Sequence, residues 1–168
     1  MQDINIREDF RRDGLCMTFL ADETVMSNLA LAFPRSILNI GYPAICCKEE
    51  EMCKKITDSL SGLEVETATV GHAIPDHLEK MANIANRQAN TSANFWIPFS
   101  DYMIRQTVKK SIGELLVYTK DMVDYWKTLS DRPLDVAFVD ITARNEDLAQ
   151  RLCAFYNELK ERGVRSVI

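Results

Sequence analysis

Polar side chains that suit metal binding, anion binding and proton transfer stand directly after several short β-rich runs of this chain. Arg12 and Asp13 follow the first run, and Asn39 lies near the end of the second. A carboxylate is a suitable oxygen ligand for Mg²⁺ or Mn²⁺, and a guanidinium pairs with a carboxylate or a developing oxyanion. The later runs are followed by five further candidates: His72, Ser100, Asp140, Thr142 and Arg144.

The β-rich runs alternate with longer helical runs along the whole chain. The expected strands cover 4–11, 36–40, 63–70, 94–98, 134–141 and 164–168. The expected helices cover 23–33, 49–60, a run that begins at Pro75, 104–129 and 146–162. Repeated strand–helix–strand units predict parallel strands joined by right-handed crossovers. Functional groups gather at the carboxyl ends of such strands, so the candidate residues are expected at one edge of the sheet.

Two α/β architectures fit this alternation. One is a series of parallel (β/α) units of an incomplete TIM-type barrel, about strands 1 to 6, because a full barrel takes about 250 residues. The other is an open, doubly wound sheet. The 168 residues fit one domain, and no linker or repeat divides residues 1–168.

The composition argues against several classes of protein. The formal net charge of −5 and the lack of a basic run argue against a nucleic-acid partner. No apolar stretch approaches the ~20 residues that a membrane helix needs, and the first residues are too polar for a signal peptide. The five cysteines are an odd number without disulfide spacing, which indicates reduced thiols in a cytoplasmic protein.

Several candidates also have a plain structural interpretation. Arg12 and Asp13 can form an exposed salt bridge that closes a loop. His72 fits a capping or exposed loop histidine as well as it fits a ligand or an acid–base group. Ser100 and Thr142 are suitable N-caps for the helices that follow them.

Four motifs, taken in order, resemble those of the DRE-TIM metallolyases, the family of isopropylmalate, homocitrate and citramalate synthases and HMG-CoA lyase. The motifs are Arg12-Asp13-Gly14-Leu15, Gly41-Tyr42-Pro43-Ala44, Pro98-Phe99-Ser100-Asp101 and Asp140-Ile141-Thr142-Ala143-Arg144. Each motif alone is weak, and their ordered succession carries the resemblance. It covers essentially the whole chain and implies about the first five and a half β/α units of a catalytic barrel.

The resemblance implies metal-assisted formation or cleavage of a carbon–carbon bond between an acyl-CoA and a 2-oxo acid, in a synthase-like reaction. Arg12 would be the catalytic residue that stabilises negative charge. Asp13 would bind a divalent metal, which is Mg²⁺, Mn²⁺ or Zn²⁺. The implied substrate-binding residues are Asn39, His72, Ser100, Asp140, Thr142 and Arg144.

The chain departs from the family at several reactive positions. Asn39 stands where a glutamate is usual, Met103 stands where a histidine is expected, and Asp140 is one methylene shorter than the usual glutamate. The family's other two metal ligands form a His-x-His pair on strand seven, beyond Ile168. We therefore do not expect this chain alone to be active. The alternative is an inactive barrel fragment or subunit that associates with a second copy, as a homo-oligomer, or with a partner that completes the barrel.

Overall fold

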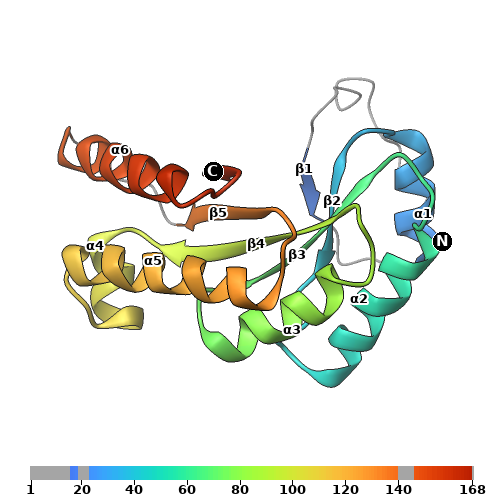
Figure 1. Ribbon diagram of the computed structural model, residues 1–168, viewed down its shortest axis with the longest axis horizontal. Helices are drawn as coiled ribbons and strands as arrows, with labels where there is room; N and C mark the ends of the chain where they lie inside the picture. Colours follow the sequence, from blue (N-terminus) through green and yellow to red (C-terminus); the bar gives the residue numbers. More distant parts are fainter. Residues whose placement is uncertain (1–15, 19–22, 140–145, 168) are drawn as a thin grey trace.

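The computed structural model describes residues 16–18, 23–139 and 146–167, which form a parallel sheet with helices packed on it (Figure 1). The strands are β1 (Cys16–Thr18), β2 (Ile37–Gly41), β3 (Glu66–His72), β4 (Thr91–Pro98), β5 (Leu134–Val139) and β6 (Ser166–Val167). The helices are α1 (Glu23–Ala32), α2 (Cys47–Ser59), α3 (Pro75–Ala85), α4 (Asp101–Met103), the π-helix η2 (Ile104–Val108), α5 (Ile112–Leu129) and α6 (Glu146–Glu161). Within these ranges, no helix has both the length and the apolar character needed to cross a membrane.

The six strands are hydrogen-bonded in chain order, and every neighbouring pair is parallel. This confirms the expected parallel α/β sheet. A doubly wound sheet reverses its strand order at a switch point. The described strands contain no such reversal, so the alternative of an open doubly wound sheet is wrong for this part of the chain. A sequential order arises when each crossover helix returns the chain to the next position on the same side.

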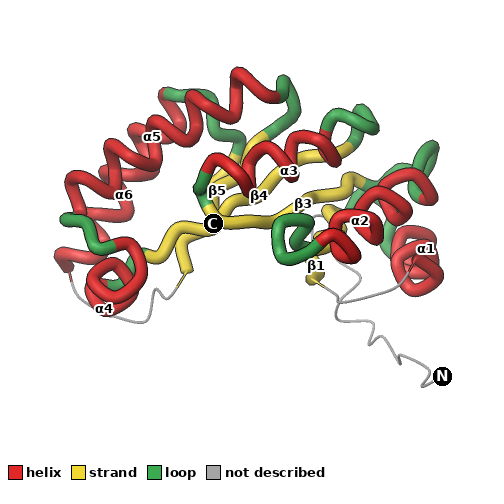
Figure 2. The backbone as a smooth tube through the Cα atoms, turned by 90° about the horizontal axis from the view of Figure 1, so that it is seen from below, coloured by secondary structure: helices red, strands yellow, loops and turns green. Residues whose placement is uncertain are grey.

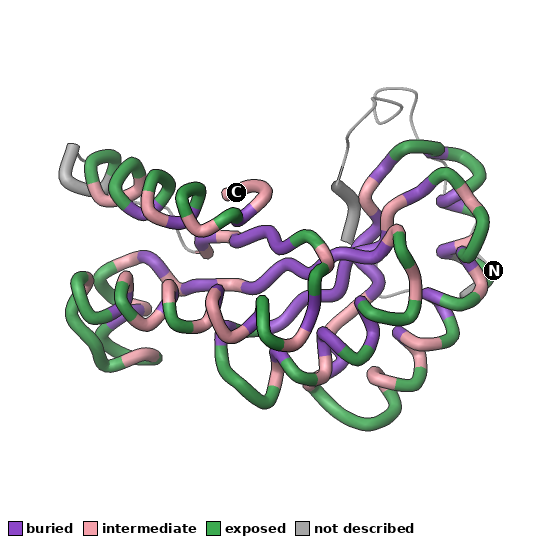
Figure 3. Tube along the Cα trace, in the orientation of Figure 1, coloured by how far each residue is buried: buried purple, intermediate pink, exposed green. Residues whose placement is uncertain are grey.

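The longer helices lie along one face of the sheet (Figure 2). Leu38 and Ile40 of β2 share a hydrophobic core with α1 and α2. Phe95 and Ile97 of β4 belong to a second core with α3, α5 and α6. Buried residues concentrate along the central strands between these helices and the opposite face (Figure 3). Alternation along each strand therefore assigns one set of side chains to the helices and the other set to the opposite face, which we call the inner face.

The inner face carries polar side chains that are almost fully buried. Asn39, Asn94 and Asp135 alternate with the core-facing residues of β2, β4 and β5, and they are 4%, 9% and 3% exposed. Burial of such groups is costly unless they are hydrogen-bonded. Among the described residues, Oδ1 of Asn94 has no hydrogen-bond donor.

The segment 104–129, expected as one helix, consists of η2 and α5 with a break between them. Lys109 ends η2 in the left-handed conformation, with a φ of 55°. Ser111 then caps α5 in a capping box: its hydroxyl accepts a hydrogen bond from the Glu114 N–H (3.3 Å), and the Glu114 carboxylate accepts one from the Ser111 N–H (2.8 Å). The apolar spacing continues across the break, so the hydrophobic pattern alone does not reveal it.

The structure also contains a short strand that the sequence did not predict. The predicted strand 4–11 lies outside the described residues, whereas β1 occupies Cys16–Thr18 and pairs with β2 from Ile37 to Asn39. Sequence analysis placed residue 16 beyond the end of the first strand. Three residues are too few to show the alternation by which a strand is identified.

Candidate functional site

Three of the predicted site residues lie in the described part of the chain, close to the carboxyl ends of three neighbouring strands. Asn39 is in β2, His72 is the last residue of β3, and Ser100 follows β4 by two positions. Because these strands are parallel, their carboxyl ends meet at one edge of the sheet, which we call the carboxyl edge. The other predicted site residues lie outside the described residues: Arg12, Asp13, Asp140, Thr142 and Arg144.

Asn39 and Ser100 both form hydrogen bonds that shape the backbone at this edge. The Asn39 Oδ1 accepts a hydrogen bond from the Gly41 N–H (3.3 Å), where the register between β2 and β3 shifts. The Ser100 hydroxyl oxygen accepts one from the Met103 N–H (3.1 Å) and caps α4. The capping interpretation of Ser100 is therefore confirmed. Substrate contact by Asn39 and Ser100 stays a prediction.

His72 belongs to a cluster of four rings at the carboxyl edge, together with Tyr42, His77 and Trp96. The five close ring pairs have centroid distances of 5.3 to 6.3 Å. His72 pairs with Trp96 in the register of β3 and β4, and Tyr42 directly follows β2. Three consecutive strands and the start of α3 therefore build this cluster, which we call the ring cluster.

Hydrogen bonds within the ring cluster assign the tautomer of His77. Its Nδ1 lies 2.7 Å from the Tyr42 hydroxyl oxygen, and the His72 backbone N–H donates towards both atoms at 3.3 Å. A backbone N–H can only donate, so we assign a lone pair to the Nδ1 of His77. The Tyr42 hydroxyl then donates to Nδ1, and Nε2 carries the proton.

Burial determines the charge state of this hydrogen-bonded pair. It lowers the pKa of His77, the neighbouring His72 lowers that pKa further, and Asp76 opposes both effects. Burial also raises the pKa of Tyr42, against the hydrogen bond from the His72 N–H. The pair is therefore a neutral phenol and a neutral imidazole at pH 7. Beside it, the imidazole of His72 is the most exposed ring of the cluster.

Sequence reasoning found only part of the ring cluster. It gave His77 no role beyond the first turn of a helix, and it used Tyr42 only as a member of a motif. It did not select Trp96. The available signal was alternation in β4, which sends Phe95 to the helices and Trp96 to the inner face.

A cavity of about 380 Å³ opens beside the ring cluster, between the ends of β3, β4 and β5 and the segment from η2 to α5. We call it the β4–α5 cavity. Trp96, Ile97 and Leu115 form part of its largely apolar wall, and His72 and Lys110 also line it. The cavity combines an apolar interior with two nitrogen-bearing side chains, so its shape and chemistry suit a small organic ligand.

A different set of polar groups lies near the amino ends of the same strands. The Arg165 guanidinium donates from Nε to Asp135 (3.0 Å) and from Nη1 to Glu66 (2.7 Å), and its Nη2 also contacts Asp135. Ser166 donates to Asp135 (2.6 Å), and Ser92 donates to Glu66 (2.5 Å). These hydrogen bonds, with Asp135 as the main partner, raise the pKa of Arg165. We call this group the amino-end network.

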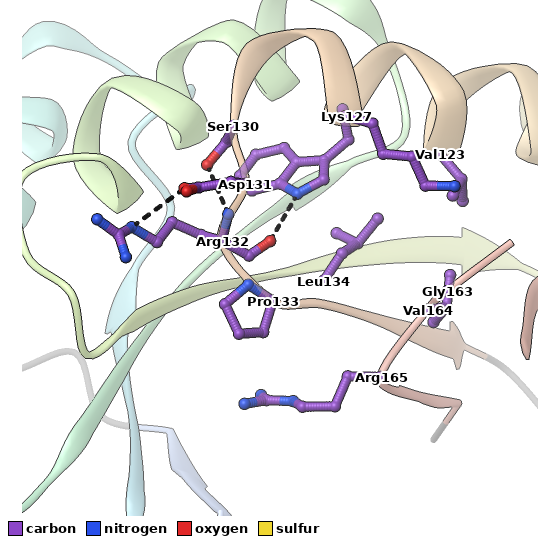
Figure 4. Close-up of a pocket in the computed structure, with 11 residues that line it drawn as sticks. Val123, Lys127, Ser130, Asp131, Arg132, Pro133, Leu134, Gly163, Val164 and Arg165 are labelled. Carbon is purple, nitrogen blue, oxygen red and sulfur yellow. Dashed lines mark hydrogen bonds and ion pairs between the residues drawn. The ribbon is translucent and has the colours of Figure 1, made fainter.

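A second cavity, of about 440 Å³, lies beside the amino-end network (Figure 4). Trp126 lines it and donates from Nε1 to the Arg132 carbonyl oxygen (3.1 Å). Arg165 lines it as well, but its guanidinium is occupied by Asp135 and Glu66. The polar groups at this end are therefore largely satisfied by the chain itself.

Metal ligands do not gather in the described part of the chain. Within residues 16–18, 23–139 and 146–167, no group of three His, Cys, Asp or Glu side chains lies close enough to hold a metal ion. Cys53 is buried and donates to the Ile40 carbonyl oxygen (3.5 Å). Burial and the nearby Glu49 raise the pKa of the Cys53 thiol to about 12, so this thiol is unreactive. The predicted metal ligand, Asp13, lies outside the described residues.

No family model matches the chain, and no curated protein matches it significantly. The likeness to the DRE-TIM metallolyases therefore stays a resemblance of motifs. The structure adds one observation to that resemblance. Asn39, His72 and Ser100 lie near the same edge of a parallel sheet whose strands follow chain order.

Proposed function

We propose that the protein is a divergent TIM-type barrel protein of the DRE-TIM metallolyase type, acting in the cytoplasm. It would bind an acyl-CoA and a 2-oxo acid at the carboxyl edge and form or break the carbon–carbon bond between them. The observation that supports this most is the sheet itself, with six parallel strands in chain order and helices on one face. Successive units of a β/α barrel have this arrangement, and their active sites lie at the carboxyl ends of the strands.

The described residues would orient the substrates in this proposal. His72 presents an exposed imidazole at the end of β3. The Tyr42 hydroxyl and the His77 imidazole both accept from the His72 backbone N–H, and so fix the backbone at the end of this strand. Asp140, Thr142 and Arg144 come directly after β5 in the sequence, so the proposal gives them substrate contacts from the next strand.

A divalent metal would be held by Asp13, and Arg12 would stabilise the developing negative charge. A carboxylate suits such a metal, which would polarise the carbonyl group of the oxo acid. The described residues contain no three-ligand group of their own.

Calorimetric titration with Mn²⁺ and Mg²⁺ tests the metal part of this proposal. The native chain is expected to bind the metal, and Asp13→Asn, which keeps the side-chain volume, is expected to lose binding without a change in its unfolding curve. Release of the CoA thiol from acetyl-CoA in the presence of 2-oxo acids tests the reaction. Metal binding that is absent, or that survives in Asp13→Asn, would contradict the role of Asp13.

Association without catalysis is a second candidate function, and Met103 favours it. Met103 lines the β4–α5 cavity at the position where the resemblance implies a histidine, and a thioether cannot transfer a proton. The chain would then act by binding a second copy or a partner that completes the barrel. Sedimentation velocity tests this function: a strictly monomeric chain that also releases CoA thiol would exclude it.

A further inference from the structure

We propose that the β4–α5 cavity binds a compact organic anion, with an apolar group inside the cavity and its acidic group beside Lys110. The volume of about 380 Å³ lies in the range of small-molecule sites. The carboxylate of a free acid and the phosphate of a phosphate monoester share this chemistry. The site uses neither Arg12 nor Asp13, so the inference does not rest on the proposed reaction.

The interior of the cavity favours the apolar part of such a ligand. Ile97 and Leu115 face it from β4 and α5, and both are at most 2% exposed. Pro98 and Val139 close the side formed by the strand ends, and Trp96 adds an aromatic surface. Transfer of an apolar group from water to this wall is favourable because it removes apolar area from solvent.

Lys110 gives the opening of the cavity a positive charge. Its Nζ lies 5.2 Å from the centroid of the Tyr118 ring, and this cation–π contact holds the ammonium group beside the cavity. Among the described residues, no carboxylate lies within ion-pair distance of Lys110. Glu114 is the acidic group whose charge interacts with it, and that carboxylate is engaged by two hydrogen bonds from Ser111. The charge of Lys110 is therefore available to a ligand.

The backbone around this opening is unusual in two ways. Thr107 and Val108 line the cavity from η2, a π-helix, and π-helices occur frequently at functional sites. Lys109 adopts the left-handed conformation, which is unfavourable for a residue with a Cβ atom and also tends to occur at functional sites. Lys110 directly follows this break and lines the cavity together with Leu115 of α5.

Intrinsic fluorescence tests the proposal, because the two tryptophans of the chain report different places. Trp96 lines the β4–α5 cavity, whereas Trp126 is buried and lines the cavity at the amino end. Octanoate is expected to change the fluorescence saturably, and this change is expected to disappear in Trp96→Phe. Octylammonium has the same chain and the opposite charge, and we expect it to bind at least about tenfold more weakly. Octyl phosphate identifies the acidic group: binding tighter than that of octanoate assigns a phosphate to the site, and weaker binding assigns a carboxylate.

Three variants locate the site. Lys110→Ala is expected to weaken octanoate binding about tenfold and to leave 1-octanol binding unchanged. Thr107→Phe fills the opening and is expected to weaken both ligands. Lys127→Ala is the matched control, because Lys127 is a partly exposed lysine that lines the other cavity.

Three results would overturn the inference: no saturable octanoate binding, equal affinity for octanoate and octylammonium, or octanoate binding that Lys110→Ala leaves unchanged. Urea unfolding of each variant separates loss of binding from loss of fold. All titrations contain EDTA, so they remain informative when Asp13→Asn and the thiol-release assay disprove the proposed reaction.

Discussion

The polar side chains at the two ends of the parallel strands differ in whether other side chains of the protein pair with them. At the amino end, Arg165 links Asp135 and Glu66, so the charges of this network are paired within the chain. At the carboxyl edge, the imidazole of His72 is exposed and Lys110 has no carboxylate partner among the described residues. Internally paired charges hold strands together, whereas charges without a partner remain available to a ligand. Parallel β/α proteins divide stability and function between these two ends in the same way.

The amino-end network also joins strands that are far apart in the sequence. Glu66 begins β3, Asp135 is in β5, and Arg165 stands directly before β6. One guanidinium therefore connects three segments across the inner face. At the carboxyl edge, the ion pair between Arg151 and Asp101 joins α6 to α4 and is largely exposed, and it links no strands.

The largest effect is expected from Arg165→Met, which removes the charge and keeps most of the side-chain length. It leaves the carboxylate of Asp135, 5% exposed, without its cation. We expect the free energy of unfolding to fall by about 2 to 4 kcal/mol, because loss of one partner from a buried ion pair is strongly destabilising and water partly screens the Arg165 side chain, of which a third is exposed.

Urea unfolding measures this loss, and Arg151→Met provides the control. Arg151 pairs with Asp101, which is 61% exposed, at 2.7 Å, so this substitution is expected to cost less than about 1 kcal/mol. Equal losses in the two variants would remove the distinction between the ends of the strands.

Gly71→Ala is expected to have a smaller effect, at the carboxyl edge. A Cβ atom at Gly71 would lie 2.5 Å from the sulfur atom of Met81, which is fully buried, and 3.4 Å from the Tyr42 ring. We expect a loss of about 1 to 3 kcal/mol, because the core must move to admit one methyl group.

Gly113→Ala is the control, since no atom lies within 4 Å of its added Cβ atom, and we expect it to stabilise α5 by about 0.5 kcal/mol. Thermal unfolding of both variants compares the two positions. An unchanged midpoint for Gly71→Ala would show that the Met81 side chain moves aside without cost.

The smallest expected effect is the pH dependence due to His77. Burial lowers its pKa in the folded chain below the ordinary value of 6.5, so the unfolded chain binds more protons as the pH falls through 6.5. The native chain is therefore expected to lose stability from pH 7 to pH 5, whereas His77 contributes no pH dependence well above 6.5. His77→Gln is expected to show a shallower loss over the same range.

NMR titration measures this pKa directly, because the chain has only two histidines and His77→Gln identifies the signals. The groups that act on His77 are His72, Asp76 and Lys80, besides its burial. A pKa above 6.5 would reverse the expected slope and show that a proton on Nδ1 is tolerated beside the His72 N–H.

The regular elements could be predicted because their signals are local. Glu23 to Ala32 and Pro75 to Ala85 carry helical spacing or a proline at the first turn, and both form the expected helices. The break at Lys109 was missed because its cause is a backbone conformation that leaves the apolar spacing unchanged. Three-residue β1 was missed because it is held by pairing with β2 and has no pattern of its own.

The candidate site could be predicted only where one strand end supplied the residue. Asn39, His72 and Ser100 were found in this way. The Tyr42–His77 hydrogen bond joins residues 35 positions apart, and the Arg165–Glu66 pair joins residues 99 positions apart. A single sequence gives no distance between such residues, so neither contact was predicted.

The position of Cys53 has a consequence for the movement of α2. Its sulfur atom lies against the Ile40 carbonyl oxygen and 3.2 Å from the place where a Cβ atom of Gly41 would stand. Helix α2 cannot separate from β2 without uncovering this sulfur atom, whereas Cys46 and Cys47 are already exposed at the start of the same helix. The rate at which an alkylating reagent modifies Cys53 therefore reports how often α2 separates from β2. The rapid modification of the exposed Cys46 and Cys47 gives the reference rate for unprotected thiols in the same helix.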